Sequence, residues 1–256
     1  MKKLIPILLF LVSFQSFAQR QFDIEVIIFK RSVNPEQTNE SWPNTLPEID
    51  MSKAIALRNG VAMERKGAKM LPTSSYELNS EYQALKRHAA FKPMMHVAWR
   101  QGDQGRFAAP VFHIQAGKDY SERFDAAGNM RGAEQSVEGL SDEIQEQTIH
   151  SPIYELDGKL QVYVQHYLFA ELSLDLKAPS VREVSFAEPS LEISEEQTDA
   201  DVQVGNLTEV TPTLEVEEFL KSYRMEQKRR MRSTETHYLD HPLMGMIIQV
   251  RRVPQA

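Results

Sequence analysis

Residues 160–176 read LQVYVQHYLFAELSLDL, and every second residue of this stretch is apolar except His166. Side chains alternate between the two faces of a strand, so the pattern predicts one face in a core and the other facing water. At about 3.3 Å per residue the run would span roughly 56 Å, about three times a usual strand. We therefore expect one long strand of an antiparallel sheet, with a bulge or bend between residues 166 and 170. Its apolar face comprises Leu160, Val162, Val164, Leu168, Ala170, Leu172, Leu174 and Leu176.

Other segments on both sides of this stretch have the composition of strands. Residues 22–29, FDIEVIIF, are rich in β-branched and aromatic residues and predict a buried strand. Residues 94–101 and 106–115 are apolar runs separated by Gly-Asp-Gln-Gly, which is typical of a hairpin turn. Residues 228–239 and 244–253 predict a further hairpin that ends the chain.

Two segments have helical patterns instead. Ser80 and Gln83 have the spacing of a capping box, and the apolar residues that follow predict a helix ending near Phe91, ahead of Pro93. Residues 214–223 predict a shorter helix because their large apolar side chains recur at helical spacing. The sequence thus predicts an α+β, β-rich fold of mainly antiparallel sheet with one or two packed helices and long surface loops.

The first residues of the chain suggest its domain organisation. Lys2 and Lys3 precede an apolar run, and Ser16 and Ala18 are small residues at the positions a signal peptidase requires, so residues 1–18 predict a secretory signal peptide. No later stretch approaches the roughly 20 apolar residues of a membrane helix, so we expect no transmembrane segment after cleavage. The remaining residues 19–256 are predicted to form a single domain located in the periplasm.

Charge is distributed unevenly along the second half of the chain. The formal net charge is −7, yet residues 183–220 contain acidic residues and no Lys or Arg, whereas residues 221–256 are predominantly basic. Residues 183–212 have too few apolar side chains to offset the entropy of ordering, and they predict a flexible acidic insertion. There is no cysteine, which excludes cysteine catalysis, thiolate metal sites and a lipid anchor on cysteine.

Signals of catalysis are weak. His237 and His241 with Asp240 have the spacing of a zinc motif on a helix, but Pro242 and the strand-like flanks favour structural histidines in a turn. The chain contains no Gly-x-Ser-x-Gly and no Ser-x-x-Lys. His166 alone makes no metal site. We expect no enzyme activity, no metal and no cofactor.

The candidate ligand-binding residues are basic and aromatic. Arg224, Lys228, Arg230 and Arg232 would share one face of an extended segment, and such a stripe suits an anionic polymer. In the periplasm that polymer is peptidoglycan, with its stem-peptide carboxylates, and nucleic acid is not expected as a partner. Tyr163 and Tyr167 are predicted to be exposed and could stack on sugar rings. The alternative is a solvated strand face, or one neutralised by the acidic insertion.

Several strings from end to end of the chain resemble the CsiV family of periplasmic cell-shape-integrity proteins. They are FDIEVIIF at 22–29, ESWP at 40–43, HVAWRQ at 96–101, GKL at 158–160 with Tyr167-Leu168, and RRMRSTETHYLDHP at 229–242 with Gly245 and Val250. The resemblance implies a non-catalytic peptidoglycan-binding protein that supports cell-wall assembly together with the lipoprotein activator of a class A penicillin-binding protein. Two other readings remain open: a structural adaptor that contacts only another protein, and a metal-dependent cell-wall hydrolase that uses residues 237–241.

Overall fold

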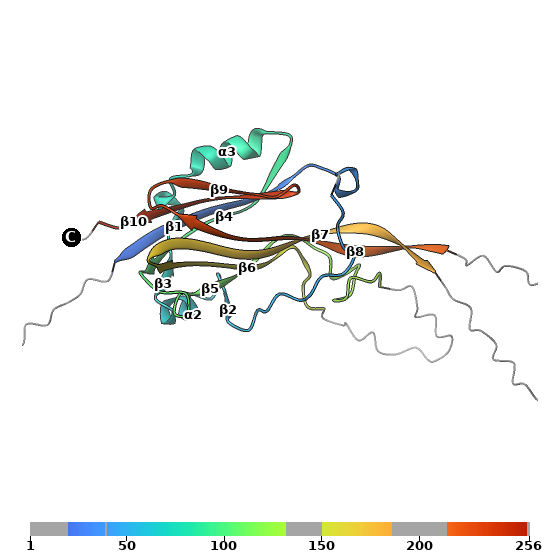
Figure 1. Cartoon of the computed structure of the whole chain (residues 1–256), viewed down its shortest axis with the longest axis horizontal. Coiled ribbons are helices and arrows are strands. Elements are labelled where there is room, and N and C mark those ends of the chain that lie inside the picture. The colour runs from blue at the N-terminus through green and yellow to red at the C-terminus, as the bar shows by residue number, and fades with distance from the viewer. Residues whose placement is uncertain (1–19, 39, 132–149, 186–213, 255–256) are drawn as a thin grey trace, which may run out of the picture.

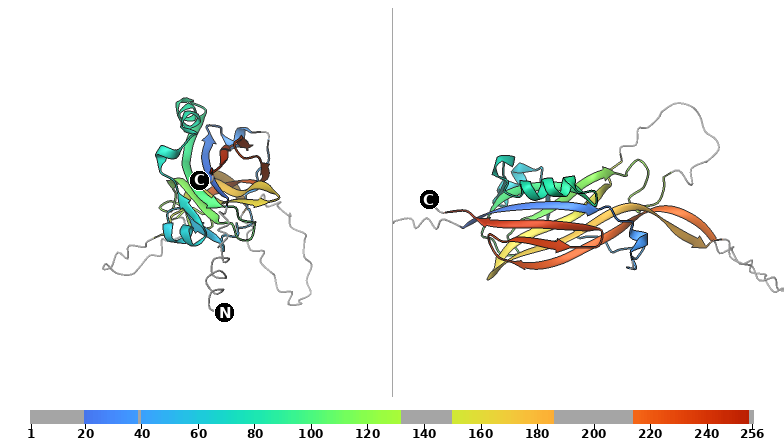
Figure 2. Two further views of the ribbon diagram at one scale, coloured as in Figure 1. Left: turned by 90° about the vertical axis from the view of Figure 1, so that its left-hand side faces the viewer. Right: turned by 90° about the horizontal axis from the view of Figure 1, so that it is seen from above.

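The structure is a computed structural model that describes residues 20–38, 40–131, 150–185 and 214–254. Two five-stranded sheets pack face to face (Figures 1 and 2). Sheet A has the order β3 (Ala68–Met70), β4 (Phe91–Gly102), β1 (Gln21–Arg31), β10 (Met244–Arg252), β9 (Thr236–Asp240). Sheet B has the order β2 (Ala54–Ala56), β5 (Val111–Asp119), β6 (Tyr154–Gln165), β7 (Tyr167–Ser185), β8 (Leu214–Met231). Among the described strands only the β2–β5 pair is parallel.

Two α-helices and two short 3-10 helices complete the described part of the chain. They are α2 (Gly60–Arg65), α3 (Asn79–Arg87), η1 (Pro35–Gln37) and η2 (Thr73–Ser75). Figure 2 shows α3 on the outer side of sheet A. The predicted β-rich α+β class is confirmed, and so is a helix in this region. The capping box is wrong, because Ser80 lies inside α3 and the N-cap residue Leu78 makes no side-chain cap, and the helix ends at Arg87 and not near Phe91. None of the helices in the described ranges is long and apolar enough to cross a membrane.

The core lies between the two sheets and is formed by the alternating apolar residues of both. Ile24, Val26 and Ile28 of β1 are buried in the same cluster as Leu160 and Leu172 of sheet B. Each fully buried side chain of this size contributes roughly 1.5–3 kcal/mol. Across the interface, Trp99 of β4 meets Phe112 of β5 edge to face with ring centroids 4.9 Å apart.

Residues 160–176 form two strands and not one. His166 has a positive φ of 62° and turns the chain, so that β6 and β7 pair as an antiparallel hairpin with Leu160 opposite Leu172. The predicted single strand with a bulge is therefore wrong. The predicted apolar face is confirmed, because residues paired across a hairpin point to the same side of the sheet. His166 interrupts the apolar pattern because it occupies the turn.

Two other sequence predictions are corrected by the sheet pairing. Residues 94–101 and 106–115 are not a hairpin, because β4 pairs within sheet A and β5 pairs within sheet B. Residues 214–223 are the first part of β8 and not a helix, because hydrogen bonding to β7 along the whole of β8 overrides the helical spacing. The β9–β10 part of the predicted final hairpin is confirmed, whereas β8 ends at Met231.

The predicted signal peptide and most of the acidic insertion lie outside the described residues. Residues 183–185, the first three of the predicted insertion, continue strand β7 and pair with the beginning of β8. Because β7 and β8 both extend beyond the end of β6, they project from the body of the fold as a two-stranded ribbon (Figure 1).

Candidate functional site

The outer face of sheet B, away from the core, is hollowed into a cleft of about 980 Å³. Strands β5 to β8 contribute to its floor, and residues 47–55 and 106–109 form its walls. In Figure 1 the segment that precedes β2 runs along this side of sheet B. The lining carries both signs of charge: Lys53, Lys66, Arg106, Lys159, Arg224 and Lys228 against Glu48, Asp50, Glu171 and Glu226.

Two basic side chains hold one wall of the cleft in place. Arg224 forms a bidentate ion pair with Asp175, both bonds 2.8 Å long, and donates a third hydrogen bond of 2.7 Å to the carbonyl oxygen of Pro47. Lys159 Nζ donates to the carbonyl oxygen of Asp50 at 2.6 Å. The hydrogen bonds to Asp175 raise the pKa of Arg224. Arg224 was expected to be a free surface charge; instead its side chain is only 14% exposed and each of its three nitrogens donates a hydrogen bond.

The floor of the cleft is fixed by a second network around Glu171. Arg106 donates to its carboxylate at 2.6 Å and the hydroxyl of Tyr163 donates at 3.2 Å. Burial opposes the charge of Glu171, but the hydrogen bonds from Arg106 and Tyr163 hold its pKa below the usual value. Gln161 donates to the carbonyl oxygens of Arg106 and Ala109, which fastens the loop to the sheet. These hydrogen bonds hold the floor of the cleft in place without a ligand.

Cations stacked on aromatic rings lie beside the cleft, at the turn between β6 and β7. We call Tyr167, Phe169, Lys228 and Arg230 the hairpin patch. Lys228 Nζ lies 5.3 Å from the ring centroid of Phe169, and Arg230 Cζ lies 4.3 Å from that of Tyr167. Tyr167 is 55% exposed, and both cations are exposed. Such cation–π contacts position the charges without removing them from solvent.

Of the remaining predicted ligand-binding residues, Tyr163 lies beneath this patch, whereas Arg224 and Arg232 lie away from it. The ring of Tyr163 is 1% exposed and stacks on Phe169 at 5.5 Å, so the expectation that Tyr163 is exposed is wrong. Arg232 lies past the end of β8, where it pairs with Glu235 at 3.5 Å. The structure therefore brings together Lys228, Arg230 and Tyr167 at the surface with Tyr163 buried beneath them, whereas Arg224 and Arg232 pair with acidic residues elsewhere.

Sequence reasoning missed Phe107, which lines the cleft and is 97% exposed. It follows Arg106 in the loop between β4 and β5. A large aromatic residue close to the glycines of a predicted turn was the available signal. An exposed ring next to a charged cleft is a typical feature of a ligand-binding surface.

The histidine motif at residues 237–241 is part of strand β9 and the turn after it, not of a helix. His237 Nε2 contacts the backbone of Arg232, and the ring of His241 packs 5.1 Å from that of Trp42. Burial lowers the pKa of His241. In the described part of the chain no three His, Asp or Glu side chains lie close enough together to hold a metal ion.

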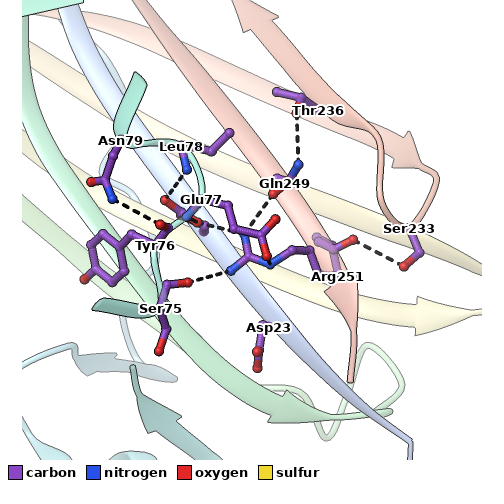
Figure 3. A network of polar contacts seen from close by, with 12 residues as sticks. Asp23, Ser75, Tyr76, Glu77, Leu78, Asn79, Ser233, Thr236, Gln249 and Arg251 are labelled. Atoms are coloured by element: carbon purple, nitrogen blue, oxygen red, sulfur yellow. Dashed lines mark hydrogen bonds and ion pairs between the residues drawn. The ribbon is translucent and has the colours of Figure 1, made fainter. Parts of the chain in front are cut away.

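A second polar network lies under α3 on the outer face of sheet A (Figure 3). Its centre is Glu25, whose buried carboxylate accepts hydrogen bonds of 2.8 Å from Arg251 and from His96 Nε2. The backbone N–H groups of Glu77 and Leu78, at the start of α3, donate to the same carboxylate at 2.8 and 2.9 Å. Because Glu25 is fully enclosed and its oxygens are already bonded, this network secures α3 and offers no binding surface.

Comparison with known proteins gives one match. The model of a family described as "Peptidoglycan-binding protein, CsiV" matches residues 3–253. No curated protein and no solved structure matches.

Proposed function

The chain belongs to the CsiV family of peptidoglycan-binding proteins, and we propose that it binds peptidoglycan through the outer face of sheet B without acting as an enzyme. The proposal includes secretion to the periplasm by cleavage after residue 18, and support of cell-wall assembly together with the lipoprotein activator of a class A penicillin-binding protein. The observation that carries the binding surface is the hairpin patch, with its two exposed cations held over aromatic rings at the edge of a preformed cleft.

The chemistry of this surface matches both components of peptidoglycan. The stem peptides carry carboxylates, which pair with guanidinium and ammonium groups such as those of Arg230 and Lys228. The glycan strands present sugar rings, whose C–H faces pack on exposed aromatic rings such as Tyr167 and Phe107. On the outer face of sheet A, the network around Glu25 does not offer exposed cations beside exposed rings, because Glu25 is enclosed beneath α3.

Retention on purified sacculi tests the proposal. The double variant Lys228→Gln/Arg230→Gln should be retained less than wild type at low salt, because two exposed charges are lost. Wild-type retention should itself fall with salt, since the Debye length decreases from about 10 Å at 0.1 M to about 3 Å at 1 M. Lys86→Gln/Arg87→Gln is the matched control, because it removes two exposed charges from α3 on the other sheet.

Two results would count against the proposal. If the control variant loses as much retention as the patch variant, net charge alone governs binding and the outer face of sheet B has no special role. If wild type is not retained on sacculi at any salt concentration, the protein is an adaptor that contacts other proteins only. Circular dichroism of each variant must show an unchanged fold.

A further inference from the structure

The cleft contains exposed charges of both signs on neighbouring positions of one strand. Glu226 and Lys228 are two residues apart on β8, so their side chains leave the same face roughly 7 Å apart. Both are exposed, and within the described residues neither forms an ion pair. Glu171 lies opposite Lys228 across the β7–β8 pair and is attracted to it, but the hydrogen bonds to its carboxylate come from Arg106 and Tyr163.

This arrangement favours a ligand that carries an amine and a carboxylate together. A simple anion would be attracted by Lys228 and repelled by Glu226, and a simple cation would meet the opposite conflict. A zwitterionic centre, with both groups on one carbon, satisfies both side chains at once. Lys53 and Glu48 place a second pair of exposed opposite charges on the wall formed by residues 47–55.

We propose, building on the peptidoglycan binding proposed above, that the cleft recognises the stem peptide at a diamino acid whose distal amine and carboxylate are both free. The carboxylate is bound by Lys228 and the amine by Glu226. When two stem peptides are cross-linked, that amine becomes an amide and loses its charge. The cleft therefore distinguishes peptidoglycan that is not yet cross-linked from peptidoglycan that is.

The shape and rigidity of the cleft support this assignment. Its volume of about 980 Å³ is sufficient for a peptide segment, since ligand pockets are roughly 300–1,000 Å³. The bonds from Arg224 to Pro47 and from Lys159 to Asp50 fix the wall in advance, which reduces the entropy lost on binding. Lys228 belongs to both the cleft and the hairpin patch, so a glycan on the patch can carry its attached stem peptide into the cleft.

Calorimetric titration of the full secreted chain with three soluble fragments tests the proposal. The probes are a disaccharide tripeptide ending in diaminopimelate, the same compound with the distal amine acetylated, and the disaccharide without peptide. The free-amine compound should bind about tenfold more tightly than the acetylated one, which corresponds to loss of one charge-assisted hydrogen bond. Glu226→Gln should abolish this difference, whereas the matched control Glu81→Gln on α3 should preserve it.

The outcomes separate this inference from the proposed function. Equal affinity of the free-amine and acetylated compounds for wild type, with sacculi still retained, overturns the inference and leaves peptidoglycan binding intact. An unchanged preference in Glu226→Gln also overturns it. Failure of wild type to bind sacculi overturns both. Tight binding of the disaccharide without peptide, equal to that of the tripeptide compound, places recognition on the glycan and contradicts a role for the cleft.

Discussion

Replacing Arg224 by Gln should destabilise the protein much more than replacing Lys228 by Gln, four residues further along the same strand face. Arg224 donates two hydrogen bonds to Asp175 and one to Pro47, and both charged side chains are mostly buried, 14% and 12% exposed. Removing one partner leaves the Asp175 carboxylate without its counter-charge. Breaking a buried ion pair costs 3–5 kcal/mol and hydrogen bonds to charged groups contribute about 1.5–3 kcal/mol, so we expect about 2–4 kcal/mol for this partly buried pair.

Thermal unfolding monitored by circular dichroism measures this difference. At about 2–4 °C per kcal/mol for a protein of this size, Arg224→Gln should lower Tm by roughly 5–15 °C. Lys228→Gln should lower the free energy of unfolding by no more than about 1 kcal/mol, because its ammonium group is exposed and loses only its contacts with the rings of Phe169 and Tyr163. The double variant Asp175→Asn/Arg224→Gln should lose less stability than the two single variants combined, because it leaves no buried charge unpaired. Equal Tm shifts for Arg224→Gln and Lys228→Gln would refute the distinction between a wall-forming and a free cation.

Three further outcomes are expected. Leu172→Asp should unfold the protein or lower the free energy of unfolding by several kcal/mol, because Leu172 is in the core. Ser173→Asp should lower it by about 1 kcal/mol, because Ser173 is buried on the outer face near other acids. Equal losses in urea titrations would show that the two faces are not distinct. Glu25→Gln should flatten the dependence of stability on pH. Burial opposes the charge of Glu25, but hydrogen bonds from Arg251, His96 and two backbone N–H groups outweigh it and lower its pKa from 4.5, so its contribution to stability is present above about pH 4.5 and disappears as the pH falls through the lower folded-state pKa. An unchanged pH profile of urea unfolding would contradict this. Phe107→Ala should leave Tm unchanged and reduce retention on sacculi, and unaltered retention would show that this ring makes no contact.

The apolar alternation of residues 160–176 predicted which side chains enter the core but not how the chain runs. Side-chain period is two in a single strand, and pairing across a hairpin preserves it, so both arrangements place Leu160 and Leu172 on one face. The choice between them depends on the left-handed conformation of His166, which periodicity does not encode. The separation of β4 and β5 into different sheets was equally inaccessible, because a short connection between two apolar runs is compatible with either arrangement.

The residue types of the candidate site could be predicted from the sequence, but the residues that each of them contacts could not. Arg224, Lys228 and Arg230 share one face of β8, as their sequence parity indicated. The register with β7 decides their surroundings: it places Asp175 opposite Arg224, Glu171 opposite Lys228 and Phe169 opposite Arg230. One cation is thereby neutralised within the fold, and the other two are exposed beside aromatic rings. The cleft depends on residues 47–55, which are held to β6 and β8 by hydrogen bonds that span 109 and 177 residues of sequence.

Mapping of amide chemical shifts on titration with a disaccharide tripeptide tests most directly whether the outer face of sheet B contacts peptidoglycan. We expect the largest changes in β7, β8 and the loop around Phe107, with Lys228 and Arg230 among the residues that shift. Little change is expected at α3 and the strands of sheet A beneath it. Shifts concentrated at α3, with β7 and β8 unaffected, would contradict the assignment of the binding surface to sheet B.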